Sequence, residues 1–243
     1  MDKQIQLPKR IQKIVDLIPP SSCIADIGCD HAYVPIEAVR QGKAQHAIAC
    51  DVRTGPLQHA EEHILFAGLA GKIEIRCSDG LERVQAGEAD TVVMAGMGGP
   101  LMERLLLGRL DDFPHFVLSP QSEIPHFRHF LLDQGMKIEE ETMLVEDGKY
   151  YVILNVSKNQ EGHTSTACAP GSERDGQEAL QDAAYMREED FLYGGRLLQR
   201  KDPVLKAFLK KEKQRYEEIL TKTDAAEIRA AYAYCVSALE VFQ

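Results

Sequence analysis

Short strand-like runs alternate with helical stretches through the first half of the chain, and this alternation restricts the possible folds more than any other feature. The strand-like runs, rich in Val, Ile, Ala and Cys, lie at 23–30, 46–52, 73–80, 91–96 and 116–121. The helical stretches lie at 54–69, 100–110 and 124–135, and the first two carry a proline near their start. Strands that alternate with helices in this way form parallel sheets. The sequence therefore predicts an α/β fold.

The segment 136–158 breaks the alternation because it holds two strand-like runs with no helix between them. Asp147 and Gly148 separate these runs, and an Asp-Gly pair is a strong signal for a tight hairpin turn. We therefore expect the parallel strands to be followed by a terminal antiparallel hairpin. A Rossmann-like sheet of this kind is typical of class I methyltransferases, although a fold alone does not establish chemistry.

The C-terminal part of the chain predicts an α-helical hairpin. Apolar residues recur at helical spacing over 203–221, a Thr-Lys-Thr stretch interrupts them, and a second helix follows. Asp224 and Glu227 precede that second helix with the spacing of a capping box. The stretch 157–178 is polar and aperiodic, which predicts a linker. We expect a sheet domain over 1–157, a linker or irregular region over 158–195 and a basic helical hairpin over 196–243.

Charge is distributed unevenly along the 243 residues. The formal net charge of −10 argues against a protein that coats itself in nucleic acid. Residues 1–157 hold 15 basic and 23 acidic side chains, whereas 196–222 holds nine basic and four acidic ones. The positive charge is therefore local. The hairpin is either a binding surface for an acidic partner or a packing module with solvated lysines.

Composition gives the broad class of protein. Hydrophobic residues make up 44% of the chain, no run is long enough to span a membrane, and no secretory signal is evident. We therefore expect a cytoplasmic protein that does not bind membranes. The six cysteines form no Cys-x-x-Cys pair, so reduced thiols are expected. We also expect a monomer, because the C-terminal pattern is that of an intramolecular hairpin.

The stretch CIADIGCDHAY at 23–33 indicates what kind of ligand the sheet binds. A dinucleotide site uses three glycines so that backbone amides approach a pyrophosphate, but here only Gly28 is present and Asp30 takes the place of a second glycine. Because a carboxylate repels phosphates, NAD and FAD are disfavoured. S-adenosyl-L-methionine has no phosphate and carries a sulfonium and an ammonium group, so an acidic loop suits it better.

Further candidate ligand groups stand at the ends of the next strand-like runs. Asp51 follows Gly28 by 23 residues, where a carboxylate accepts hydrogen bonds from both ribose hydroxyls. Asp79 stands where an acidic or polar side chain commonly meets the adenine amino group. The glycines of AGMGG at 95–99 leave backbone groups bare beside the cofactor sulfur. A glycine-rich anion cradle is the alternative, but no Gly-Lys-Ser/Thr follows these glycines.

The sequence resembles the bacterial tRNA (adenine-22-N1)-methyltransferases. The resemblance rests on ADIGCDHAYVP, SDG, AGMGG, the EDGKYYV hairpin and the basic C-terminal hairpin, and it covers nearly the whole chain. It implies a class I fold that binds S-adenosyl-L-methionine over 1–157, and a C-terminal helical extension that helps to hold tRNA. The candidate cofactor residues are Arg10, Asp26, Gly28, Cys29, His31, Asp51, Val52, Asp79, Gly80, Ala95, Gly96, Met97 and Gly98.

The absence of one motif indicates which atom of adenine is methylated. AGMGG lacks the Asp/Asn-Pro-Pro-aromatic signature of enzymes that methylate the adenine amino group, which fits attack through a ring nitrogen better. N1 of adenine attacks a methyl group in line once the base has left its pairing partner, so no strong base is required. Asp30 is the candidate that stabilises the developing cation or accepts the N6 proton, with His31 and Tyr33 as candidate positioning groups.

Basic residues near both ends of the chain, and one after the fifth strand, are the candidate contacts to tRNA. They are Lys9, Lys13, Arg128, Arg196, Arg200, Lys201, Lys206, Lys210 and Lys213. His59 and His63 lie four residues apart, as zinc ligands on a helix do, but no third ligand is indicated and no metal is expected. Two other functions stay open: a cofactor-binding RNA protein without catalysis, and a methyltransferase for a small molecule or a protein.

Overall fold

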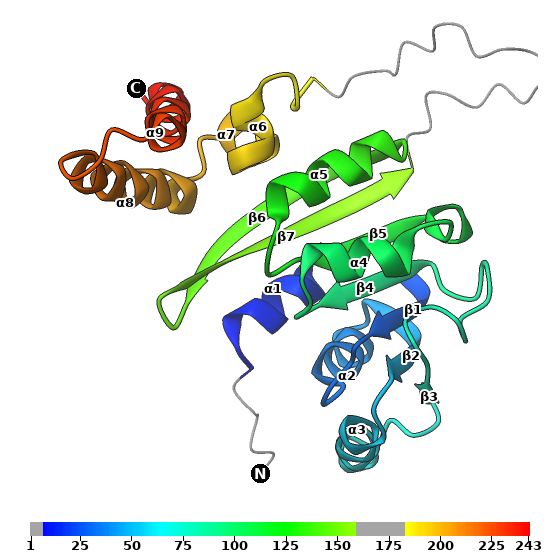
Figure 1. Cartoon of the computed structure of the whole chain (residues 1–243). Coiled ribbons are helices and arrows are strands. Elements are labelled where there is room, and N and C mark those ends of the chain that lie inside the picture. The colour runs from blue at the N-terminus through cyan, green and yellow to red at the C-terminus, as the bar shows by residue number, and fades with distance from the viewer. Residues whose placement is uncertain (1–6, 159–182) are drawn as a thin grey trace, which may run out of the picture.

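The computed structural model describes residues 7–158 and 183–243. Within them, seven strands form one sheet in the order β3-β2-β1-β4-β5-β7-β6 (Figure 1). The parallel strands are β1 (Ser21–Ile27), β2 (Ala44–Asp51), β3 (Ile73–Cys77), β4 (Thr91–Ala95) and β5 (His115–Ser119). β7 (Lys149–Lys158) runs antiparallel to both of its neighbours, β5 and β6 (Met136–Glu146). The predicted class I methyltransferase sheet is confirmed.

A two-residue turn joins β6 to β7, as the Asp-Gly pair predicts. Asp147 and Gly148 both lie in the left-handed region, with φ of 49° and 74°. Turns of this kind match the right-handed twist of the strands that they join. Tyr150 and Tyr151 follow as consecutive residues of β7, so their side chains lie on opposite faces of the sheet.

Helices cover both faces of the sheet (Figure 1). α1 (Lys9–Leu17), α2 (Tyr33–Arg40) and α3 (Thr54–Phe66) contribute to one buried apolar cluster. α4 (Gly99–Leu106) and α5 (Ile124–Asp133) contribute to a second cluster on the opposite face, and the short 3-10 helix η1 (Leu110–Asp112) precedes β5. The helices described are all too short or too polar to cross a membrane.

The second apolar cluster continues into the C-terminal helices, which are α6 (Glu188–Tyr193), α7 (Gly195–Gln199), α8 (Pro203–Leu220) and α9 (Ala226–Glu240). α8 and α9 form the expected hairpin, with Leu209 and Cys235 fully buried between them. Residues 159–182 of the linker or irregular region predicted over 158–195 lie outside the described residues. The rest of the region expected to be irregular includes α6, where the buried Asp190 carboxylate accepts hydrogen bonds from the backbone N–H groups of Met186 and Arg187. The domain boundaries stay predictions.

α1 and α2 are absent from the helical stretches that the sequence predicts, and the start of α9 differs from its prediction. No start signal marks α2, since its N-cap residue, Ala32, makes no side-chain cap and has a left-handed φ of 56°. Burial of apolar side chains such as Ile36 forms this helix instead. The capping box predicted at Asp224 and Glu227 is wrong, because α9 begins after Ala225 without a side-chain cap and the Asp224 carboxylate pairs with Arg229 at 2.9 Å.

A buried ion pair fastens the C-terminal helices to the sheet. Arg128 of α5 donates from Nε to Glu141 Oε1 of β6 at 2.7 Å, and the two side chains are 2% and 0% exposed. Arg128 Nη1 also donates to the carbonyl of Phe191 in α6 at 2.7 Å, and Glu141 Oε2 accepts the N–H of Arg196 in α7 at 3.2 Å. The prediction that Arg128 contacts RNA phosphate is therefore wrong, because its guanidinium lies inside the protein.

The backbone between α6 and α7 can approach this ion pair closely because the two residues at the corner, Gly194 and Gly195, have no side chain. Gly194 has a φ of 98°, and a Cβ at Gly195 would lie 1.7 Å from the carbonyl oxygen of Ala184. No other residue type fits at Gly195 without displacing that backbone.

Replacement of Arg128 by Met should lower the free energy of unfolding by about 3 to 5 kcal/mol, because Glu141 is then left buried without its partner. Urea unfolding of the variant measures this loss. The double variant Arg128→Met/Glu141→Leu removes both charges and should recover most of the stability. A single variant that loses less than about 1 kcal/mol would contradict the assignment of a buried pair.

Candidate functional site

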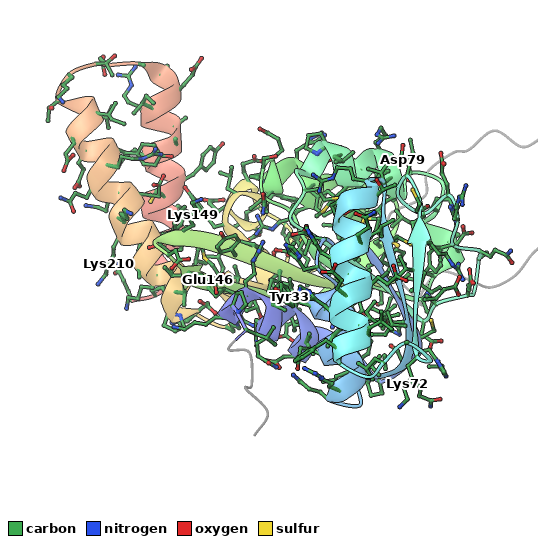
Figure 2. The ribbon with its side chains drawn as sticks, turned by 90° about the horizontal axis from the view of Figure 1, so that it is seen from below. Tyr33, Lys72, Asp79, Glu146, Lys149 and Lys210 are labelled. Atoms are coloured by element: carbon green, nitrogen blue, oxygen red, sulfur yellow. The ribbon has the colours of Figure 1, made fainter. Side chains whose placement is uncertain are left out.

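The carboxyl ends of the parallel strands bring the loops with the predicted cofactor residues to one edge of the sheet. Ile27 pairs with Cys50 and Met94, and Asp51 pairs with Cys77, so β1 to β4 end at nearly the same level. Ligands of open α/β sheets bind at this edge. Tyr33 and Asp79, which follow β1 and β3, mark this part of the molecule in Figure 2.

The β1–α2 loop, residues 28–32, is fixed at its start. The N–H groups of Gly28 and Cys29 both donate to the carbonyl of Cys50, at 2.8 and 2.9 Å. Gly28 has a φ of 77°, and a Cβ there would lie 2.7 Å from Met97 Cε. The loop after β1 therefore lies directly against the loop after β4, as the two glycine-containing motifs predict.

Two acidic side chains are buried together at the strand ends. Asp26 and Asp51 are 4% and 5% exposed. Asp51 accepts a hydrogen bond from the N–H of Arg53 at 2.9 Å, whereas burial and the nearby Asp51 carboxylate raise the pKa of Asp26 to about 7. A cationic or hydroxyl-rich ligand would offset this accumulation of negative charge. The pair therefore favours a ligand with a positive group or with hydroxyl donors.

The side chains around this acidic pair suit a flat, partly apolar ligand. Val52 is 60% exposed beside Asp51 and provides an apolar surface. Asp79 lies 3.5 Å from Arg104 Nη2 of α4, so its carboxylate has a partner in this structure. Gly96 has a φ of 86°, and the nearest group to a Cβ there is the Gln121 amide at 3.9 Å. The sequence motifs did not identify Arg104 or Gln121. Arg104 belongs to α4 and Gln121 follows β5, so both lie outside the loop motifs that predicted the cofactor residues.

Among the residues that the structure describes, two buried nitrogen atoms have no hydrogen-bond partner: Arg10 Nε and His31 Nδ1. The Arg10 guanidinium lies 4.9 Å from the centre of the Tyr151 ring, and the backbone N–H of Arg10 donates to Glu146 Oε1 at 3.3 Å. Unsatisfied buried donors are rare in folded proteins. Together with the buried carboxylates, they fit a ligand that carries a carboxylate as well as cations, as S-adenosyl-L-methionine does.

Aromatic rings beside the β1–α2 loop form a cluster that the sequence patterns did not predict. The His31 ring lies 5.4 Å from that of His59 and 5.5 Å from that of His63, both in α3, and the Tyr33 ring lies 5.3 Å from that of His63. The four-residue spacing indicates that His59 and His63 share a face of the helix, but only the fold shows what that face contacts. Within 7–158 and 183–243, no group of three or more His, Cys, Asp or Glu side chains could hold a metal ion.

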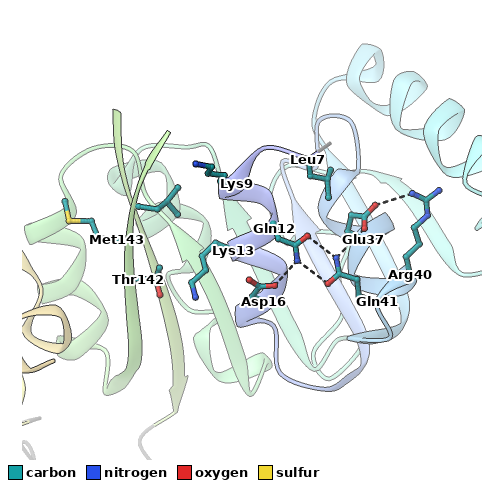
Figure 3. Close-up of a pocket in the computed structure, with 11 residues that line it drawn as sticks. Leu7, Lys9, Gln12, Lys13, Asp16, Glu37, Arg40, Gln41, Thr142 and Met143 are labelled. Atoms are coloured by element: carbon teal, nitrogen blue, oxygen red, sulfur yellow. Dashed lines mark hydrogen bonds and ion pairs between the residues drawn. The ribbon is translucent and has the colours of Figure 1, made fainter. Parts of the chain in front are cut away.

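The predicted RNA-binding residues lie in several places. Lys9 and Lys13 of α1 line a groove of about 850 Å³ between α1, α2 and β6 (Figure 3). Lys206, Lys210 and Lys213 follow one another along α8. Lys206 donates to the Phe242 carbonyl at 3.4 Å, and Lys213 pairs with Glu217. The exposed Lys210 side chain, labelled in Figure 2, makes no hydrogen bond or ion pair with the residues that the structure describes.

The remaining predicted RNA contacts take part in the attachment of the C-terminal helices. Arg196 Nε donates to the carbonyl of Ile138 at 2.8 Å. Arg200 pairs with Asp202 at 2.9 Å, and Lys201 donates to the carbonyl of Gln243 at 3.4 Å. That these residues bind RNA stays a prediction, and a phosphate would have to compete with these intramolecular contacts.

The known proteins that this chain resembles are methyltransferases, which agrees with a site that fits S-adenosyl-L-methionine. The sequence profile of the methyltransferase domain family matches residues 7–154. The tRNA (adenine(22)-N(1))-methyltransferase of Bacillus subtilis is 38% identical over 154 residues, which span 62% of this chain and 65% of that relative. The chain thus covers slightly under two thirds of the curated relative's length.

Two solved structures extend the similarity to nearly the whole chain. The crystal structure of the B. subtilis M1A22 tRNA methyltransferase TrmK is 30% identical, with a TM-score of 0.75 and coverage of 98% of both chains. A Streptococcus pneumoniae protein solved in complex with S-adenosyl-L-methionine is 29% identical, with a TM-score of 0.76 and coverage of 98% of this chain and 100% of that one.

The pKa of Asp26 predicts an unusual dependence of stability on pH. Because burial raises this pKa from 3.8 to about 7, the folded protein holds the proton more tightly than the unfolded chain does. The stabilisation that this bound proton gives the folded state is complete below the pKa of Asp26 in the unfolded chain, and it is lost as the pH rises through 7. Relative to Asp26→Asn, the parent protein should lose up to about 4 kcal/mol of stability between pH 4 and pH 8. Urea unfolding at several pH values tests this, and parallel pH profiles of the two proteins would rule it out.

Proposed function

Because the chain belongs to the methyltransferase domain family, we propose that it transfers a methyl group from S-adenosyl-L-methionine to N1 of an adenine in tRNA. The observation that carries the proposal is the match to the B. subtilis tRNA methyltransferase over 98% of both chains, which includes the C-terminal helices. The names of that protein and of the curated B. subtilis relative support adenine 22 as the target.

The residues at the strand ends fit the cofactor. Asp51 would accept hydrogen bonds from the ribose hydroxyls, and the unpaired Arg10 Nε would meet a carboxylate. The Asp26 carboxylate would ionise more easily beside the ammonium group. When bound, S-adenosyl-L-methionine supplies an electrophilic methyl group. The complex of the related S. pneumoniae protein with this cofactor supports the assignment.

Asp30 is the residue to which we assign the stabilisation of charge. Its side chain is 62% exposed, so a base can reach it, and the carboxylate lies 3.7 Å from His31 Nε2. The N1 lone pair attacks the methyl carbon as the carbon–sulfur bond breaks, and the sulfur keeps the bonding electrons. The adenine ring then becomes cationic, and Asp30 either stabilises that cation or accepts the N6 proton.

The helical hairpin supplies the proposed tRNA surface. α8 lies beside β6 at one edge of the molecule, whereas the acidic strand ends lie within the sheet domain. A methyltransferase for a small molecule or a protein would leave this basic helix without a matching partner, whereas an RNA-binding protein without catalysis would differ only in that it transfers no methyl group. The monomeric state and the cytoplasmic location stay predictions.

The central experiment is transfer of labelled methyl groups to bulk tRNA, followed by mass mapping of the modified base. The parent protein should modify N1 of an adenine, and Asp30→Asn should lower the single-turnover rate by about a hundredfold or more. Asn tolerates the left-handed φ of 49° at this position, so the substitution isolates the charge. A rate within about threefold of the parent would remove Asp30 from this role.

Lys210→Glu should weaken tRNA binding and flatten its dependence on salt by about one unit of slope, because one phosphate contact is lost. The matched control is Lys72→Glu, which reverses another exposed charge next to β3, at the opposite edge of the sheet (Figure 2). Filter binding at several salt concentrations measures both variants. The triple reversal of Lys206, Lys210 and Lys213 should have a larger effect, and unchanged binding in that protein would place the RNA elsewhere.

A further inference from the structure

A hydrogen bond from α3 supports the middle of the β1–α2 loop. His63 Nδ1 lies 3.0 Å from the carbonyl oxygen of His31. Since a carbonyl oxygen only accepts hydrogen bonds, the proton must be on Nδ1 of His63. The His63 ring is also stacked on Tyr33, with ring centres 5.3 Å apart. One side chain of α3 therefore contacts the loop backbone and the first residue of α2.

The loop needs such support because its backbone is strained. Asp30 and Ala32 have φ values of 49° and 56°, a region that residues with a side chain seldom adopt. Conformations of this kind persist only where the surroundings impose them. Gly28 and Cys29 are held by the Cys50 carbonyl, and Ala32 donates to the Cys29 carbonyl at 2.8 Å. The His31–Ala32 peptide is thus held on both sides, because its N–H donates to the Cys29 carbonyl and its carbonyl accepts from His63.

We propose that His63 is a positioning residue for methyl transfer, which acts by holding the His31 carbonyl and so fixing where the Asp30 carboxylate lies. The proposal rests on the function proposed above. His63 is half-buried on α3 and acts through the loop, so it need not touch the substrate. A misplacement of about 1 Å at a reacting group costs on the order of a hundredfold in rate.

Two substitutions separate the hydrogen bond from the bulk of the ring. His63→Phe keeps a ring and removes the donor, whereas His63→Asn places an amide N–H close to the former position of Nδ1. We expect the single-turnover rate at saturating cofactor and tRNA to fall about tenfold to a hundredfold in His63→Phe and to recover to within about threefold in His63→Asn. The matched control is His59→Phe, one turn earlier on the same helix, which should stay within about threefold of the parent.

A double-mutant cycle tests whether His63 acts through Asp30. If it does, adding His63→Phe to Asp30→Asn should cause no further loss of rate beyond about twofold, because the carboxylate is already absent. Losses that multiply would overturn the proposal, and so would a His63→Asn rate as low as that of His63→Phe.

Amide hydrogen exchange provides a measurement that does not depend on activity. In the protein without cofactor or RNA, the Ala32 amide should exchange at least about tenfold faster in His63→Phe than in the parent, and at the parent rate in His63→Asn and His59→Phe. Parent-like exchange together with a parent-like rate in His63→Phe would overturn the proposal. If the parent itself does not methylate tRNA while the exchange pattern holds, the proposed function is wrong and the loop support stands.

Discussion

The ion pair between Arg128 and Glu141 is the interaction on which the arrangement of the two halves of the molecule depends. An arginine and a glutamate buried to this extent are stable only with nearly ideal partners, and here each has more than one. The partners come from α5, β6, α6 and the start of α7, so the pair fixes four elements at once. Because the α8–α9 hairpin follows α7 directly, its position relative to the sheet depends on this contact.

The candidate site follows from a different constraint, the common level at which the parallel strands end. Gly28 allows the first loop to approach Met97, and the two buried aspartates create a need for positive charge at the same place. A class I fold therefore supplies the location, and the acidic side chains supply the preference for a ligand without phosphates. Arg10 Nε, which has no hydrogen-bond partner among the described residues, adds a second, opposite preference, because a carboxylate on the ligand would satisfy it.

Much of this could be predicted from the sequence because the relevant signals are local. Alternating patterns predict the strands, and Asp147-Gly148 predicts the hairpin turn. Local patterns do not predict the burial or contacts of a residue when these depend on a partner far away in the sequence. Arg128 stands between two histidines and reads as a surface residue, but Glu141, thirteen positions later on another element, makes it a core residue. The contact of His63 with the His31 carbonyl spans 32 positions and depends on how α3 packs, so spacing alone could not indicate it.

The two neighbouring tyrosines of β7 have a consequence for how the ends of the molecule communicate. Tyr150 meets Phe208 of α8 with ring centres 4.9 Å apart, whereas Tyr151 lies under the Arg10 guanidinium on the other face. The two residues share one peptide bond, so a displacement of α8 that moves β7 also moves the support of Arg10. Any coupling free energy carried by this strand is reciprocal: a ligand on the helix that alters affinity at Arg10 by some factor must itself be bound more or less tightly, by that same factor, when the Arg10 site is filled.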